Sequence, residues 1–463
     1  MADNEKQFEV DFEAFMISPD GGWTKADDSG YRSAQSAGMA LDIATLVSFV
    51  KSTQPISWQR FERQCGSDHV HKFYKVFEDA VEANGLVSVL RHGFKHRGIE
   101  FRVCYFKPES TLNDAAQEHY QQNVCQCIRQ WHYSAQSPNS VDMMLAVNGI
   151  PVIAVELKNQ LTAQSVDDAK RQWMFDRDAK EPVFLLNHRV LAFFTVDLYQ
   201  AFMTTKLNGA KTTFLPFNQG SNGAGNDGGA GNPQASDGDY VTSYVWKDVL
   251  QKDSLLDIVQ KFIHYQVKTE HEIQSDGTER THITKELVFP RYHQLDVVRK
   301  LIANVRENGP GRNYLVEHSA GSGKSNSIAW TAYRLASLHD ADNHPMFASV
   351  IVVTDRTVLD AQLQETVSGF DHTLGSVVTI DEKKNSKDLR DAINDGKRII
   401  VTTLQKFPII YNEVNDVTGK AFAIIVDEAH SSQTGTSAAK LKMALADTTD
   451  ALKEYEELES RNE

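Results

Sequence analysis

The stretch that decides the fold of the first half of the chain runs Val141-Asp-Met-Met-Leu-Ala-Val147, Asn148-Gly149, Ile150-Pro-Val-Ile-Ala-Val-Glu-Leu-Lys158. Two apolar runs flank an Asn-Gly pair, which is strongly favoured in tight hairpin turns because both central residues take positive φ there. We therefore predict a β-hairpin with strands at Val141–Val147 and Pro151–Leu157. Acidic residues lie on both strands.

The predicted hairpin places two carboxylates and a lysine close together. Asp142 lies on the first strand, and Glu156 and Lys158 lie one residue apart on the second, so that their side chains share a face. Carboxylates on adjacent strands can share a divalent cation, and a nearby lysine can orient or deprotonate an attacking water and offset phosphate charge. Glu156 follows the apolar Ile153-Ala-Val155, where an unpaired charge is costly. A salt bridge at the strand ends is the alternative.

This pattern resembles the PD-(D/E)xK nucleases, and the resemblance implies that Asp142 and Glu156 bind metal while Lys158 takes part in catalysis. Some of these nucleases carry a Gln-x-x-x-Tyr element on the following helix. Here Gln172 occupies the first position, but Asp176 stands where the tyrosine would be. We therefore carry over only Gln172 as a catalytic residue, against the alternative of a solvated helix face.

A phosphate loop is indicated by Gly321-Ser-Gly-Lys-Ser325, which follows a predicted strand and opens a predicted helix. In that setting backbone N–H groups and a helix N-terminus surround a polyphosphate. Lys324 would reach the terminal phosphates and Ser325 would bind Mg²⁺, whereas a plain Gly-Ser turn is the alternative. The pattern departs from the usual loop at its first glycine position, which is His318. The residues expected to bind ATP or GTP are Gly321, Ser322, Gly323, Lys324 and Ser325.

A second motif, Asp427-Glu428-Ala429-His430, follows the apolar run Phe422–Val426. Carboxylates in this position lie at the carboxyl edge of a parallel sheet, where α/β proteins bind ligands. We expect Asp427 to hold Mg²⁺ through water and Glu428 to polarise the attacking water. A helix cap is the alternative.

Three smaller signals resemble motifs of superfamily-two helicases. Gln294 resembles their adenine-reading glutamine, against the alternative of an exposed helix residue. Thr354-Asp-Arg356 and Thr402-Thr-Leu-Gln-Lys406 resemble their DNA-contacting motifs, against a helix cap and a plain strand end.

Apolar periodicity predicts further elements in both halves. Helical spacing appears at Ile43–Val50, Phe73–Ala83 and Ser325–Leu338. Short apolar runs alternate with helical stretches downstream, which predicts a parallel sheet with helices on both faces. The strands predicted there are Tyr314–Val316, Val350–Val353, Ile399–Val401 and Phe422–Val426.

Two polar segments divide the chain. Asn218–Asn232 is glycine-rich, and its composition predicts a flexible surface loop. Lys268–Arg280 is a polar run that predicts a hairpin or a connector between domains. We place the domain boundary near residue 260, with an α/β nuclease-like domain at 1–260 and a RecA-like phosphate-loop domain at 261–463.

Composition limits the class of protein. The chain has 463 residues, of which 41% are hydrophobic, and this is enough for two or three globular domains. Its net charge of −14 argues against electrostatic coating of nucleic acid, although a local basic groove or a partner subunit can still bring DNA. Its four cysteines show no C-x-x-C spacing, and its N-terminus has no basic segment followed by an apolar one. We therefore expect a cytoplasmic protein with no membrane association.

Taken together, the chain resembles the restriction (motor) subunit of type I restriction-modification enzymes. Further matching segments are Ala154–Asn159, Phe214-Leu-Pro-Phe-Asn218 and Gly229-Ala-Gly-Asn-Pro233. The resemblance implies ATP and Mg²⁺ as cofactors, translocation and cleavage of double-stranded DNA, and partnership with methylation and specificity subunits. It also makes the glycine-rich loop a recognisable part of the family.

The carboxyl terminus departs from this family. Helicase-like motors close ATP between two RecA-like domains, and the second supplies an arginine to the γ-phosphate. About 33 residues follow His430, ending in the charged, helical Leu452–Glu463, so we expect the first motor domain only and weak ATP hydrolysis. Two other classes stay open: a superfamily-two helicase or remodelling ATPase with a DNA-binding nuclease-like domain, and a docking module with vestigial sites.

Overall fold

The computed structural model contains two compact units, Met1–Tyr292 and His293–Glu463. The structure describes residues 2–109, 113–160, 164–235, 238–273, 279–319, 321–354, 366–367, 377–380, 386–403 and 420–427. No helix in these ranges is long and apolar enough to cross a membrane.

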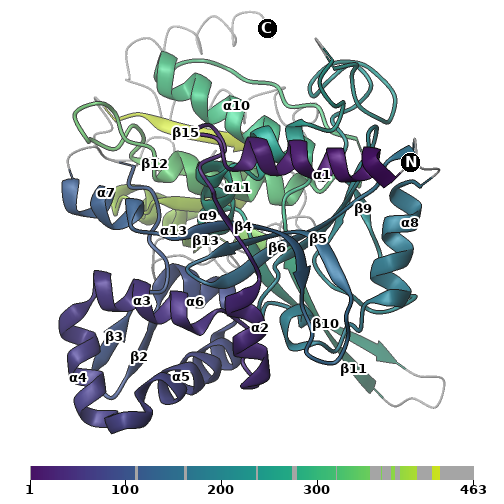
Figure 1. Cartoon of the computed structure of the whole chain (residues 1–463). Helices are drawn as coiled ribbons and strands as arrows, with labels where there is room; N and C mark the ends of the chain where they lie inside the picture. The colour runs from purple at the N-terminus through teal and green to yellow at the C-terminus, as the bar shows by residue number, and fades with distance from the viewer. Residues whose placement is uncertain are drawn as a thin grey trace, which may run out of the picture. The chain divides into compact units, whose positions relative to one another are not determined.

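The first unit is built on a seven-stranded mixed sheet with the order β1-β4-β5-β6-β7-β8-β9 (Figure 1). Its strands are β1 (Thr24–Ala26), β4 (Cys125–His132), β5 (Ser140–Val147), β6 (Ile150–Leu157), β7 (Ala192–Val196), β8 (Ala201–Thr204) and β9 (Leu215–Pro216). Its helices are α1 (Ala2–Met16), α2 (Ser29–Ser36), α3 (Ile43–Thr53), α4 (Pro55–Cys65), α5 (His69–Asn84), α6 (Leu86–His92), α7 (Asp114–Gln121), α8 (Val166–Arg171) and α9 (Lys252–Lys261). Shorter turns are the 3₁₀ segments Gly66–Asp68 and Pro182–Phe184 and the π segments Gln172–Asp176 and Val245–Val249.

The predicted hairpin is confirmed as β5 and β6, which pair antiparallel at the centre of this sheet. Asn148 and Gly149 have φ of 53° and 80°, and these are the left-handed values that a two-residue hairpin turn needs. All eight residues of β6 are buried. A strand this apolar forms because both faces of the sheet are covered, and buried aromatic side chains supply part of that cover at Trp131, Trp173, Phe184 and Phe193.

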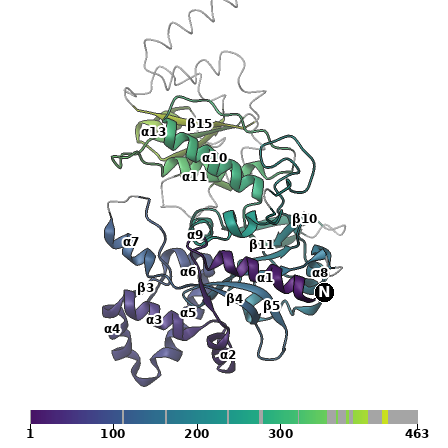
Figure 2. The same cartoon turned by 45° about the horizontal axis from the view of Figure 1, so that its top comes forward.

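A helical group formed by α3, α4, α5 and α6 joins a two-stranded sheet of β2 (Phe94–His96) and β3 (Ile99–Phe101) (Figure 2). The helices predicted at Ile43–Val50 and Phe73–Ala83 are confirmed as α3 and α5. The core of the group is aromatic, with ring centroids 5.2–5.8 Å apart among Trp58, Phe61, Phe73 and Phe101. Burial of these large rings holds the group together.

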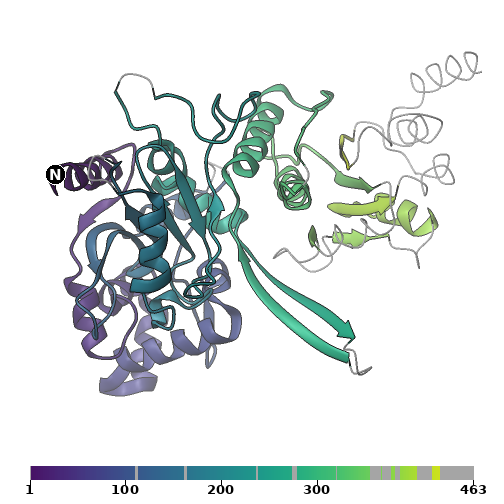
Figure 3. The same cartoon turned by 90° about the vertical axis from the view of Figure 1, so that its right-hand side faces the viewer.

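The polar run Lys268–Arg280 falls in a hairpin of β10 (His264–Ile273) and β11 (Glu279–Val288). Figure 3 shows it as a long ribbon separate from the large sheet. The chain stays with the first unit beyond this hairpin, because the Thr205 hydroxyl donates to the Leu287 carbonyl and Phe289 packs on Phe194. The division between the units therefore lies after Tyr292, further along the chain than the boundary placed near residue 260.

The glycine-rich segment forms a closed loop with backbone pairing. Gly220 N–H donates to the Gly231 carbonyl at 2.8 Å, and Ser221 N–H donates to the Gly229 carbonyl at 2.9 Å. At its base the Asn232 amide donates to Asn218 and to the Tyr199 carbonyl. This pairing closes the loop ends next to β8, a geometry that composition alone did not indicate.

The second unit contains a four-stranded, wholly parallel sheet with the order β13-β14-β12-β15. This confirms the strands predicted at Val350–Val353, Ile399–Val401 and Phe422–Val426 and the helix predicted at Ser325–Leu338. Its elements are α10 (Tyr292–Asn308), α11 (Lys324–Ala336), β12 (Ser349–Thr354), β13 (Val377–Thr379), α13 (Ser386–Asn394), β14 (Ile399–Thr403) and β15 (Phe422–Val426).

One predicted strand is wrong. Tyr314–Val316 takes no part in the described sheet, and the exposed fractions of Tyr314, Leu315 and Val316 are 40%, 83% and 43%. Three apolar residues between polar neighbours supply too little buried surface to require a strand. Tyr314 instead donates its hydroxyl to Asn304 Oδ1 on α10 at 2.8 Å.

Candidate nuclease and nucleotide sites

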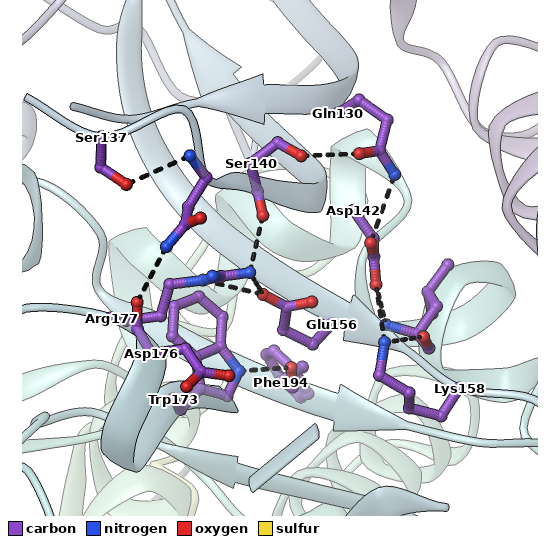
Figure 4. Close-up of polar contacts among 12 residues, drawn as sticks. Gln130, Ser137, Ser140, Asp142, Glu156, Lys158, Trp173, Asp176, Arg177 and Phe194 are labelled. Atoms are coloured by element: carbon purple, nitrogen blue, oxygen red, sulfur yellow. Dashed lines mark hydrogen bonds and ion pairs between the residues drawn. The ribbon is translucent and has the colours of Figure 1, made fainter. Parts of the chain in front are cut away.

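Polar side chains line up across neighbouring strands of the large sheet (Figure 4). Met143 on β5 pairs with Val155 on β6. The neighbouring residues Asp142 and Glu156 therefore also lie side by side, and they face the side of the sheet opposite to Met143 and Val155. The two carboxyl groups interact, because the Asp142 carboxylate raises the pKa of Glu156. From β4, the Gln130 amide donates to Asp142 Oδ1 at 3.3 Å. The structure therefore brings together the two carboxylates that the sequence singled out.

Lys158 joins the carboxylates from the end of β6. Its Nζ lies 3.7 Å from Asp142 Oδ2 and donates to the Leu157 carbonyl at 3.0 Å. The Leu157 N–H donates to the same Asp142 oxygen at 2.7 Å. Lys158 is 4% exposed, so its charge is held inside the site rather than in solvent.

Glu156 is 1% exposed and is paired with a residue that the sequence did not point to, Arg177. Arg177 Nη2 and Nε donate to Glu156 Oε1 at 2.6 and 3.2 Å. Burial raises the pKa of Glu156 well above its ordinary range, and the Asp142 carboxylate raises it further, while Arg177 and Lys158 lower it. The site therefore contains two carboxylates and two positively charged side chains, Arg177 and Lys158.

Gln172 lies in the π segment Gln172–Asp176 that follows α8, not on a regular α-helix. Its Oε1 is buried and makes no hydrogen bond to a described residue, which disfavours a solvated helix face. Asp176, which stands in the tyrosine position, uses its carbonyl to accept from Asn139. A catalytic role for Gln172 stays a prediction.

The donor atoms fit a hard divalent cation. Mg²⁺ is usually bound by one or two carboxylates and keeps several waters, and Asp142 and Glu156 supply two adjacent carboxylates. Thr195 on β7 is the register partner of Glu156, is fully buried, and has a hydroxyl with no hydrogen bond to a described residue. No group of three or more His, Cys, Asp or Glu side chains that could hold a metal occurs in the part of the chain that the structure describes.

The phosphate loop has the backbone shape that the motif requires. Gly321 and Gly323 have φ of 74° and 82°, and Gly323 is the N-cap of α11, whose first residues are Lys324 and Ser325. Side chains from α10 contact the backbone carbonyls of the loop. Gln294 is 3% exposed and donates to the carbonyls of Ser322 and Gly323 at 3.2 and 3.0 Å.

This geometry excludes the alternative that Gln294 is an exposed helix residue. The neighbouring His293 ring nitrogen Nε2 lies 3.0 Å from the Ser322 carbonyl, and the ring packs edge to face on His318. His318, which stands where the loop pattern has its first glycine, is thus packed against α10 as well.

Asp427 follows β15 at the carboxyl edge of the parallel sheet, and its N–H donates to the Val353 carbonyl on β12 at 3.0 Å. This is the edge at which the motif was expected. Glu428 and the rest of that motif lie outside the described residues, as do Asp355-Arg356, Leu404–Lys406 and Leu452–Glu463.

The fold and the sites define a class: an α/β protein with a carboxylate–lysine site on a mixed sheet and a phosphate-loop unit built on a parallel sheet. Residues 52–219 match the family described as "Type I restriction enzyme R protein N terminus". Residues 293–450 match the family described as "SWI2/SNF2 ATPase". Separate parts of the chain are thus similar to the N-terminus of type I restriction enzyme R proteins and to SWI2/SNF2 ATPases.

The chain is also similar to a named protein over a longer stretch. The chain is 27% identical over 317 residues to the type I restriction enzyme HindI endonuclease subunit of Haemophilus influenzae, an alignment that covers 64% of this chain. The alignment spans 26% of the length of that subunit.

Proposed function

We propose that this chain forms the DNA-cutting and ATP-binding part of a type I restriction R subunit. The observation that supports the proposal most is the convergence of Asp142, Glu156 and Lys158 on one face of the sheet, with Lys158 Nζ 3.7 Å from Asp142 Oδ2. The substrate would be double-stranded DNA and the cation Mg²⁺. A divalent cation bound there would supply an activated water and stabilise charge on the phosphate.

The chain's own residues would divide the remaining work. Asp142 and Glu156 would bind the cation through their carboxylates. Lys158, already inside the site, would place a positive charge against the scissile phosphate or orient the attacking water. Gln172, on the turn after α8, would contact the substrate or the water from a second side.

The second unit would bind ATP for translocation along DNA. Support comes from the left-handed Gly321 and Gly323, which open the N-terminus of α11 toward an anion. Lys324 would contact the terminal phosphates, and Ser325 and Asp427 would bind Mg²⁺. Gln294 would sit between the loop and the base, and Glu428 would act on the attacking water. Methylation and specificity subunits would be the partners, in the cytoplasm.

Nicking of supercoiled plasmid in Mg²⁺ or Mn²⁺ tests the nuclease part. We expect cleavage by the wild-type chain and loss of about 10²-fold or more in Asp142→Asn, Glu156→Gln and Lys158→Ala, the scale at which removal of one stabilising group affects catalysis. Lys324→Ala is the matched control for this assay. Cleavage that survives in all three site variants would overturn the assignment of the site.

The runner-up is a superfamily-two helicase or remodelling ATPase whose first unit only binds DNA, and the match of residues 293–450 to SWI2/SNF2 ATPases favours it. It predicts nucleotide binding without metal-dependent nicking. The same plasmid assay, run beside ATP binding, therefore separates the two functions.

A further inference from the structure

The buried arginine beside Glu156 has no place in the motifs that predicted the site. Arg177 is 8% exposed, and its guanidinium donates both to Glu156 Oε1 and to the Ser140 carbonyl, each at 2.6 Å. It also lies 5.5 Å from the centroid of the Tyr133 ring. Burying a charge is costly unless it is paired and hydrogen-bonded, so these contacts fix the guanidinium in one place.

The chain reaches this position through an irregular turn. Residues Gln172–Asp176 form a π segment directly after α8, and such segments occur mostly as single turns, frequently at functional sites. Trp173 anchors the turn, because it is fully buried and packs edge to face on Phe184 and Phe193. The turn leads directly into Arg177, which reaches Glu156 on β6.

Both bonds from Arg177 to Glu156 end on the same oxygen, Oε1. The ion pair therefore leaves the other carboxylate oxygen unused by Arg177, on a side chain that faces the same side of the sheet as Asp142. Lys158 Nζ lies near Asp142 Oδ2. Each of the two carboxylates thus has a positively charged side chain beside it, Arg177 beside Glu156 and Lys158 beside Asp142.

We infer that Arg177 is a positioning residue, which fixes Glu156 so that its second oxygen and Asp142 bind one divalent cation together. This inference rests on the proposed function of the site. Partners that orient a metal ligand typically contribute about 10- to 100-fold to metal affinity. Arg177 would not touch the substrate.

Calorimetric titration of the purified chain with Mn²⁺ at fixed pH tests this role. We expect Arg177→Met to weaken Mn²⁺ binding roughly 10- to 100-fold, and Arg177→Lys, which keeps a charge, to recover part of the loss. Arg171→Met is the matched control, because Arg171 is an exposed arginine at the end of α8, and it should bind Mn²⁺ like the wild type. The melting temperature of each variant shows whether it is folded.

The outcomes separate the inference from the function on which it rests. Unchanged or tighter Mn²⁺ binding by folded Arg177→Met, with binding lost in Glu156→Gln, would overturn the positioning role alone. If the wild-type chain binds no Mn²⁺ at this site, the proposed function fails, and the role of Arg177 fails with it. If Arg177→Met does not fold, Arg177→Lys decides the question. Mn²⁺ affinity and plasmid cleavage in Arg177→Lys that both equal those of the wild type would overturn the inference.

Discussion

At the scale of single residues, the site combines side chains that the sequence could single out with others that it could not. Glu156 and Lys158 could be predicted from the sequence because they are two charges at the end of an apolar strand. Asp142 could be predicted because it lies on the preceding strand. Arg177 could not be predicted from the sequence, because its contact with Glu156 depends on a π segment that produces no periodic pattern. Thr195 was equally hidden, because only the register of β6 with β7 sets it beside Glu156.

Thiol reactivity provides a test of burial at this scale. Burial raises the pKa of Cys125 to about 12 and also raises the pKa values of Cys104 and Cys127, whereas Cys65 is half-buried on α4. Because the thiolate is the reactive form, the three buried thiols should stay slow at pH 8 and react faster only as the pH rises toward their pKa values. We expect one fast thiol per chain with a thiol-specific disulfide reagent and four after unfolding. Cys65→Ser should remove the fast phase, and two or more fast thiols in the native chain would contradict the structure.

At the scale of elements, apolar runs were predicted well where both faces of a strand are buried. β5, β6, β12 and β14 meet that condition, and all four were predicted. β15 was predicted as well, although Ala423 is its only buried residue. Tyr314–Val316 has the same local pattern but is exposed, so the pattern could not decide by itself. The pairing of β4 with β5 and of β6 with β7 depends on contacts between distant residues, which local patterns do not contain.

Two glycines separate backbone conformation from close packing. Gly149 and Gly98 both have left-handed φ, of 80° and 76°, but a Cβ on Gly149 would lie 2.3 Å from the Asp42 carbonyl oxygen, whereas one on Gly98 would meet nothing within 4 Å. Gly98→Ala should cost about 1–2 kcal/mol of unfolding free energy from φ alone. Gly149→Ala should cost about 1–3 kcal/mol more, from overpacking. Denaturant unfolding of both variants measures the difference, and equal costs would contradict the hairpin contact.

The support of the phosphate loop by α10 gives a second prediction for an element. Gln294→Ala removes two hydrogen bonds to loop carbonyls. Binding of a fluorescent ATP analogue should therefore weaken about tenfold, which corresponds to a loss of about 1.4 kcal/mol. Glu307→Ala, an exposed position near the end of the same helix, is the control and should bind normally. Equal affinity in both variants would show that this support does not affect nucleotide binding.

At the scale of the whole molecule, the sequence predicted two α/β domains in the right order. The division after Tyr292, rather than near residue 260, follows from packing of the segment after β11 on the first unit, at Leu287 and Phe289. Polar composition marked the hairpin in between but could not indicate to which unit it belongs.

Two compact units predict two separable unfolding transitions with different ligands. A ligand stabilises the state it binds by about 2.7 kcal/mol at a concentration about 100 times its Kd. We expect Mn²⁺ to raise one transition, an effect that Glu156→Gln removes. ATP should raise the other, an effect that Lys324→Ala removes. Calorimetric melting measures both, and a single ligand that shifted both transitions equally would contradict two independent sites.

We propose that Asp142 and Glu156 together hold the cation on which DNA cleavage depends. The anomalous difference density of crystals of the chain soaked in Mn²⁺ tests this directly. We predict a peak in contact with both carboxylates, on the face of the sheet that also carries Lys158, and its loss in Glu156→Gln. A peak elsewhere on the first unit, or one that persists in Glu156→Gln, would contradict the claim.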